Sequence, residues 1–145
     1  EAPPGRIAAA VRLEGVTPRR VLLVEDNALN REVMRHMLED LGHCVVQVDN
    51  GFAALEALAA DRFDVVVMDI MMPGLGGVAT TKRLREADHG QSDIAIVACS
   101  AHVSAEDETR YREAGMTAFL PKPVDRLELA RVIDSAAQSR GHGSG

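Results

Sequence analysis

Short runs of apolar residues alternate along the chain with longer segments whose apolar residues recur every three or four positions. Continuous apolar runs bounded by turn residues are typical of strands buried on both faces of a sheet, and the longer spacing is typical of helices. Strict alternation of the two favours an α/β fold, a doubly wound parallel sheet with helices on both faces. We expect five strands, over 21–24, 44–48, 65–69, 94–99 and 118–120.

Five helices are expected between and after these strands, over about 28–41, 52–60, 78–86, 104–115 and 126–138. Asn27, Ser104 and Asp125 are suited to cap helices at their N-termini, and Gly42 and Gly115 to end them. The residues expected on the buried faces of the first and last helices are Leu29, Val33, Met37, Leu38, Leu41, Leu127, Leu129, Val132 and Ile133.

The chain divides into one domain and two flanking pieces. Residues 1–19 are rich in Pro and Gly and are expected to form a linker, residues 20–138 hold every strand and helix, and residues 139–145 are expected to form a flexible tail. With 145 residues, 46% of them hydrophobic, the chain is long enough to bury a core. We therefore expect a single globular domain.

Charge and hydropathy exclude several classes of partner. The net charge is −6, without a cluster of Lys and Arg on any predicted face, which argues against direct binding of nucleic acid. No apolar run approaches the roughly 20 residues of a membrane span, so we expect no membrane contact by this domain and a cytoplasmic location. A longer parent protein could still be anchored in the inner membrane.

Cys44 and Cys99 lack metal-binding spacing and are expected to be buried, reduced thiols.

Polar residues follow the apolar strands at their carboxyl ends, where ligands bind in open α/β sheets. They are Glu25, Asp26, Asp69, Ser100 and Lys122. Each has an ordinary structural explanation: an acid capping a turn or starting a helix, a serine ending a strand, a lysine in solvent. The combination is more specific, because the ends of parallel strands meet at one edge of the sheet. We expect one pocket there.

The chemistry of this pocket favours a divalent cation and a phosphoryl group. Three clustered carboxylates repel one another, and oxygen ligands without His or Cys suit Mg²⁺. Lys122 and Ser100 beside Asp69 could neutralise and bind phosphoryl oxygens while Asp69 attacks in line as nucleophile.

Four motifs resemble the receiver domain of two-component response regulators. They are Val-Glu-Asp-Asn at 24–27, Met-Asp-Ile-Met-Met-Pro at 68–73, Ser-Ala at 100–101 and Phe-Leu-Pro-Lys-Pro at 119–123, and the likeness covers about 20–137. The resemblance implies the flavodoxin-like receiver fold, Mg²⁺ as cofactor, and transfer of a phosphoryl group from a phosphohistidine. A histidine kinase or a histidine phosphotransfer domain would then be the partner, and a weak homodimer is compatible with the family.

The resemblance also implies a role for each site residue. Asp69 is the phosphoacceptor, Glu25 and Asp26 are the acidic pair, and the carbonyl of Met71 is a further metal ligand. In this family such a domain catalyses only its own phosphorylation and dephosphorylation.

The remaining family positions concern the switch. Ser100 would bind a phosphoryl oxygen, Lys122 would pair with the phosphoryl group, and the Lys122–Pro123 bond would be cis. Phe119 corresponds to an aromatic residue that swings inward on activation, which would change the surface of the last two helices and the strand between them.

Three departures from the family pattern affect these expectations. Glu25 replaces the commoner Asp, so it would reach the metal through water. Gly76 stands where an Asp is usual in the loop after the acceptor, which would loosen that loop. Phe119 lacks the hydroxyl of the Tyr found in many members, so no hydrogen bond could hold its inward position. None of these changes removes a chemically required group.

The parent and two rival functions remain open from the sequence. Asn27, Asn30 and the Pro-rich start resemble receivers carried by hybrid sensor histidine kinases, with a stand-alone response regulator as the alternative. A small Mg²⁺-dependent phosphohydrolase would use Asp69 as nucleophile, but it normally needs a second acid where this chain has Met71. A phosphate-independent binding module would be expected to lack one of the acids or the lysine, and this chain has them all.

Overall fold

The computed structural model describes residues 17–88, 90–101 and 104–143. Its sheet has five parallel strands in the order β2-β1-β3-β4-β5. The strands are β1 (Arg20–Val24), β2 (Cys44–Val48), β3 (Val65–Asp69), β4 (Ala95–Ser100) and β5 (Ala118–Pro121). Each is followed by a helix: α2 (Ala28–Asp40), α3 (Gly51–Ala60), α4 (Gly77–Arg85), α5 (Ala105–Ala114) and α6 (Arg126–Gly143). The predicted α/β fold with a doubly wound parallel sheet is confirmed.

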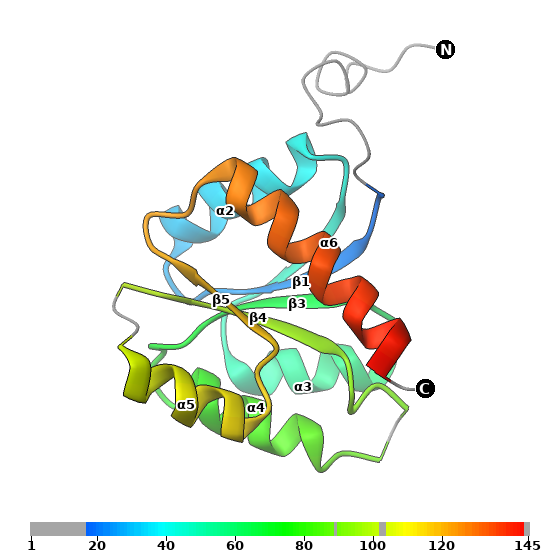
Figure 1. Ribbon diagram of the computed structural model, residues 1–145, viewed down its shortest axis with the longest axis vertical. Helices are drawn as coiled ribbons and strands as arrows, with labels where there is room; N and C mark the ends of the chain where they lie inside the picture. Colours follow the sequence, from blue (N-terminus) through cyan, green and yellow to red (C-terminus); the bar gives the residue numbers. More distant parts are fainter. Residues whose placement is uncertain (1–16, 89, 102–103, 144–145) are drawn as a thin grey trace.

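The helices cover both faces of the sheet (Figure 1), with α2 and α6 on one face and α3, α4 and α5 on the other. Alternate residues of a strand point to opposite faces, so each strand contributes to two cores. Val21 and Leu23 of β1 lie in the core under α2 and α6, whereas Leu22 and Val24 lie in the core on the other side. Burial on both faces explains why β1, β3 and β4 are almost uninterrupted apolar runs.

Side-chain caps begin most of the helices as the sequence predicts. Asn27 accepts a hydrogen bond from the Asn30 N–H at 2.9 Å, and Asp125 accepts one from the Glu128 N–H at 3.0 Å. Ser104 and Asp107 form a capping box at the start of α5, and Gly115 ends that helix in the left-handed conformation. Asn50 caps α3 by accepting a hydrogen bond from the Ala53 N–H at 2.8 Å.

Three residues predicted to be buried are exposed instead. Leu29 is 73% exposed, Val33 50% and Leu127 47%. At about 100° per residue, Leu29 lies roughly 140° around α2 from Met34, which contributes to the buried face. Leu127 is likewise displaced from the buried face of α6, which includes Leu129 and Ile133. The apolar surface of each helix is therefore wider than the stripe that contacts the sheet.

Two further expectations need correction. Cys44 is exposed because β2 is an edge strand, whereas Cys99 on β4 is buried as expected. Burial raises the pKa of the Cys99 thiol to about 12, so it stays protonated at neutral pH. The last helix continues to Gly143, beyond its expected end near 138.

The division into linker, domain and tail stays a prediction, and residues 1–16 lie outside the described part of the chain. Among the residues described, no helix is both long enough and apolar enough to cross a membrane.

The two leucines of α2 give a matched test of this arrangement. Leu38 is fully buried and Leu29 is mostly exposed. Leu38→Ala should lower the free energy of unfolding by about 2–5 kcal/mol, because it leaves a cavity. Leu29→Ala should change it by about 0.5 kcal/mol or less. Urea denaturation followed by circular dichroism measures both, and equal losses would contradict the assignment of the buried face.

Candidate functional site

The polar residues predicted to converge do lie at one edge of the sheet. Glu25 directly follows β1, Asp69 ends β3, Ser100 ends β4 and Lys122 directly follows β5. The parallel register pairs Asp69 with Cys99 and Ser100 with Pro121, which places these strand ends level with one another. Adjacent strands in one direction are therefore what brings together residues up to about a hundred positions apart in the chain.

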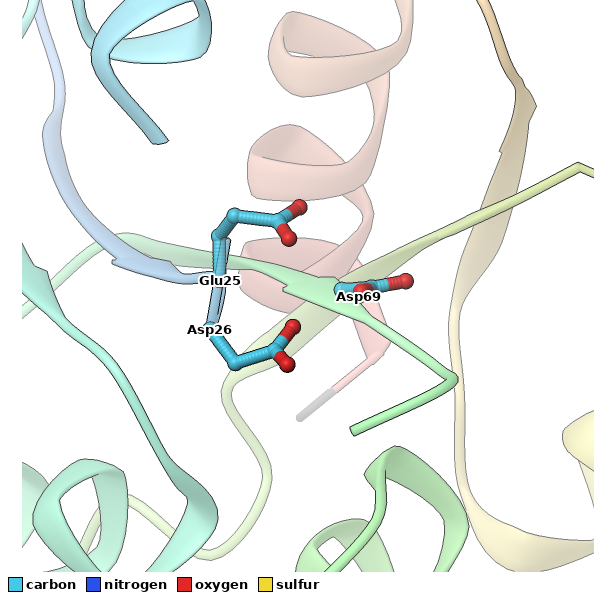
Figure 2. Close-up of side chains that lie close together, drawn as sticks. All are labelled: Glu25, Asp26 and Asp69. Carbon is cyan, nitrogen blue, oxygen red and sulfur yellow. The ribbon is translucent and has the colours of Figure 1, made fainter. Parts of the chain in front are cut away.

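Three carboxylates gather at this edge, as Figure 2 shows for Glu25, Asp26 and Asp69. One oxygen from each side chain lies within 4.8 Å of the others. Glu25 and Asp69 are buried, with 3% and 6% exposure, whereas Asp26 is exposed. A cluster of oxygen donors open to solvent on one side fits Mg²⁺, which takes one or two carboxylates and keeps several waters. The donors present thus match the predicted cation.

Lys122 supplies a positive charge to the cluster. Its Nζ lies 3.2 Å from Asp69 Oδ1 and 3.6 Å from Glu25 Oε1. Partial burial alone would lower the pKa of Lys122, but the hydrogen bond to Asp69 and the charges of Asp69 and Glu25 outweigh burial and raise it. The Lys122 N–H donates to the Ser100 carbonyl at 2.9 Å, which fixes the lysine backbone to the end of β4.

Glu25 is held by its own loop and by α2. The Asn27 N–H donates to Glu25 Oε2 at 3.2 Å, and Arg31 Nη1 donates to the Glu25 carbonyl at 2.8 Å. Burial, and then the neighbouring charges of Asp69 and Asp26, raise the pKa of Glu25 despite the opposing effects of the Asn27 N–H and Lys122. Without a cation, the folded domain therefore holds this carboxylate at an energetic cost.

The loop after Asp69 is packed closely against the start of α4. The Gly77 N–H donates to the Ile70 carbonyl at 2.9 Å, and a Cβ on Gly77 would lie 2.9 Å from the carbonyl oxygen of Asp69. Only glycine allows this approach. Gly76 precedes α4 at its N-cap position and makes no side-chain cap. The special role of Gly77 was not predicted, since close approach leaves no signal beyond the residue type.

Met71 lies in the loop after Asp69, and Ser100 ends the neighbouring strand β4. The Met71 N–H donates to Asp69 Oδ1 at 3.3 Å, and the Met71 side chain is 75% exposed. Ser100 is buried at the end of β4. The use of the Met71 carbonyl as a metal ligand stays a prediction. The expected cis bond between Lys122 and Pro123 is present.

Phe119 is half-buried on β5 and contacts two residues of α5. Its ring centroid lies 6.1 Å from that of Tyr111, with a tilt of 43° between the planes. The guanidinium of Arg112 stands over the ring at 4.8 Å from its centroid. The sequence predicted neither contact, because α5 and β5 meet only in the folded chain.

A groove of about 410 Å³ opens beside the carboxylates, between α2 and the loop after β5. Its polar end carries Glu25, Asp69 and Lys122, and its other residues are mostly apolar, including Val33, Met34, Met37, Val67, Cys99, Pro123 and Val124. Val33, an exposed apolar residue of α2, therefore borders the site.

Comparison with known proteins agrees with this site. The family model of the response regulator receiver domain matches residues 21–134 of this chain. The chain therefore belongs to the receiver domains of two-component systems, the class that the fold and the site define.

Individual relatives differ in how much of their own length this chain covers. Sensor protein GacS of Pseudomonas syringae pv. syringae is 40% identical over 116 residues, which cover 79% of this chain but 13% of that protein. The response regulator DivK of Brucella anthropi is 35% identical over 81% of this chain and 95% of its own length. The chain thus spans about an eighth of GacS, and it matches nearly all of DivK.

A solved structure shows the same fold. The receiver domain of sensor histidine kinase PA1611 from Pseudomonas aeruginosa PAO1 aligns with a TM-score of 0.76 and 33% identity, over 85% of this chain and all of that one. Its crystal structure has a magnesium ion coordinated in the active-site cleft.

The raised pKa of Glu25 predicts the pH dependence of stability. The folded domain binds the Glu25 proton more tightly than the unfolded chain, so the free energy of unfolding falls as the pH rises above the ordinary value of 4.5. Glu25→Gln removes this penalty. In urea denaturation without Mg²⁺, the variant should be more stable than the wild type at pH 7, and the gain should disappear well below pH 4.5.

Glu56→Gln is the matched control, because Glu56 is exposed on α3. It should leave stability unchanged at both pH values. A Glu25→Gln variant no more stable than wild type at pH 7 would show that burial of this carboxylate carries no penalty.

Proposed function

We propose that this domain accepts a phosphoryl group from a phosphohistidine onto Asp69, with Mg²⁺ bound by the acidic cluster. The observation that carries the proposal is the convergence of three carboxylates within 4.8 Å of one another, with Lys122 Nζ 3.2 Å from Asp69. The acceptor, the cation site and the counter-charge of the proposed reaction would thus share a single pocket.

The residues of the chain would divide the work of transfer. An Asp69 oxygen attacks phosphorus as the bond from phosphorus to the imidazole nitrogen breaks, and the imidazole leaves. Glu25, Asp26 and Asp69 would hold Mg²⁺, which supplies positive charge next to the transferred oxygens when bound. The ammonium of Lys122 would pair with one phosphoryl oxygen, and the hydroxyl of Ser100 would donate a hydrogen bond to another.

The rival functions receive less support from the site. A phosphohydrolase needs an acid that can activate water near the acceptor, and Met71 occupies the second position after Asp69. The carboxylates that do lie nearby, Glu25 and Asp26, belong to the cation cluster. A phosphate-independent module would have no reason to keep Glu25 buried at a cost.

The parent protein is proposed to be a hybrid sensor histidine kinase, anchored in the inner membrane with this domain in the cytoplasm. GacS and the hybrid signal transduction histidine kinase L of Dictyostelium discoideum support this reading, with 40% and 32% identity. DivK, which this chain covers almost completely, keeps a stand-alone regulator as the second candidate. A weak homodimer stays a prediction.

The exposed apolar residues of α2 suggest where the histidine donor docks. Val33 lines the groove beside Asp69, and Leu29 lies one turn nearer the start of the same helix. Residues four apart share a helix face, so Leu29 and Val33 form one apolar patch at the mouth of the site. A helix of a histidine kinase or phosphotransfer domain could cover this patch and present its phosphohistidine to Asp69.

The acceptor test uses a small phosphodonor. Wild-type domain incubated with acetyl phosphate and Mg²⁺ should gain the mass of one phosphoryl group, and Asp69→Asn should gain none. Removing Mg²⁺ with EDTA should reduce the adduct at least tenfold. Intact-mass spectrometry measures the adduct, with Asp49→Asn, an acid after β2, as the control. Equal adducts on wild type and Asp69→Asn would exclude Asp69 as acceptor.

The docking face gives an independent prediction. Val33→Lys and Leu29→Lys should each lower the rate of phosphotransfer from a phosphorylated histidine phosphotransfer domain about tenfold, since a buried lysine at an interface costs more than 1 kcal/mol. Phosphorylation of Leu29→Lys by acetyl phosphate should stay at the wild-type rate, because Leu29 does not line the groove.

Phe52→Lys is the control, because Phe52 is 55% exposed on α3, over the other face of the sheet. A donor that transfers equally fast to Val33→Lys and to wild type must dock elsewhere.

A further inference from the structure

Two arginines of α5 stack on aromatic rings beside the strand that carries Phe119. Arg110 lies over Tyr111 at 5.1 Å from the ring centroid, and Arg112 lies over Phe119 at 4.8 Å. The two rings differ in burial, since Tyr111 is 4% exposed and Phe119 is half-buried. Tyr111 belongs to the core under α5, whereas Phe119 packs at its border.

Arg112 is held in place by the ends of two elements. Its Nη1 donates to the Thr117 carbonyl, just before β5, at 3.3 Å. It also lies in the last turn of α5, where the helix dipole favours a positive charge. The guanidinium therefore bridges the end of α5 and the start of β5, with the face of Phe119 beneath it.

Phe119 is connected to the acceptor site through the sheet. It pairs with Ala98 on β4, two residues before Ser100, and it precedes Lys122 by three residues on its own chain segment. A shift of Ser100 or Lys122 toward a phosphoryl group would therefore act on the two strands that position this ring.

The ring cannot become buried and keep its contact with Arg112. The guanidinium is exposed, and carrying it into the core with the ring would cost its hydration. Because Phe119 has no hydroxyl, its position depends on packing against the core cluster that includes Tyr111 and on the stack with Arg112.

We propose that Arg112 is a positioning residue that holds Phe119 in its half-buried position and so opposes the switch until Asp69 is phosphorylated. The proposal rests on the proposed function. Its chemical basis is a cation–π contact, which at an exposed site changes an equilibrium about two- to fivefold. Loss of this contact should make the domain easier to activate without changing the acceptor site.

The experiment follows the ring directly. The chain contains Phe52, Phe63 and Phe119, so 4-fluorophenylalanine gives at most three ¹⁹F NMR signals, which Phe52→Leu and Phe63→Leu assign. Beryllium trifluoride with Mg²⁺, a stable mimic of the phosphoryl group, is titrated into the full chain. The readout is the mimic concentration at which half of the Phe119 signal has shifted. The midpoint is used because removing the guanidinium also changes the chemical shift of the Phe119 signal itself.

Arg112→Gln should lower this midpoint two- to fivefold. The midpoint of Arg112→Lys, which keeps the charge, should lie between those of Arg112→Gln and wild type. Arg110→Gln is the matched control, because it removes the stack on Tyr111 instead, and its midpoint should equal that of wild type. In Arg112→Gln, the fold-increase in the rate of phosphorylation by acetyl phosphate should not exceed the fold-decrease in the midpoint.

Separate results identify which proposal fails. An unchanged midpoint in Arg112→Gln, with a normal Phe119 response in wild type, overturns the role of Arg112 and leaves the acceptor function intact. The same holds if Asp69 takes phosphate while the Phe119 signal stays still. If Asp69 takes no phosphate from any donor, the proposed function fails and the role of Arg112 fails with it.

Discussion

Repulsion among Glu25, Asp26 and Asp69 is the constraint on which the site depends. The protein partly balances it with the ammonium of Lys122 and the Asn27 N–H, both in direct contact with the acids. Burial of Glu25 adds to this repulsion, and the two together raise the pKa of Glu25. A divalent cation among these oxygens would offset the repulsion between the three carboxylates.

The surrounding fold holds these charges together by backbone contacts and by the Arg31 side chain, which donates to the Glu25 carbonyl. The Ser100 carbonyl accepts from the Lys122 N–H, and the start of α4 packs on the carbonyl of Asp69 through Gly77. Asp69 ends β3 and Glu25 directly follows β1, whereas β5, at the edge of the sheet, carries the half-buried ring of Phe119. The ring packs on Tyr111 and lies beneath the exposed Arg112.

Particular residues show how far the sequence could predict this protein. The runs at β1, β3 and β4 are unambiguous because both faces are buried, and Asn27, Ser104 and Asp125 are caps because their side chains satisfy local N–H groups. The helix faces were less predictable. Leu29, Val33 and Leu127 continue an apolar pattern but stay exposed, because the width of a buried stripe depends on what packs against it.

The sequence alone determined the class of fold, the family and the chemical groups of the site, since these follow from apolar spacing and from which residues end each strand. Tertiary structure decided the rest. The 410 Å³ groove, the packing of Gly77 and the stack of Arg112 on Phe119 join elements distant in the chain. The distances between such elements, and the burial of the residues between them, depend on how the helices pack on a twisted sheet. No local pattern of residues encodes this packing.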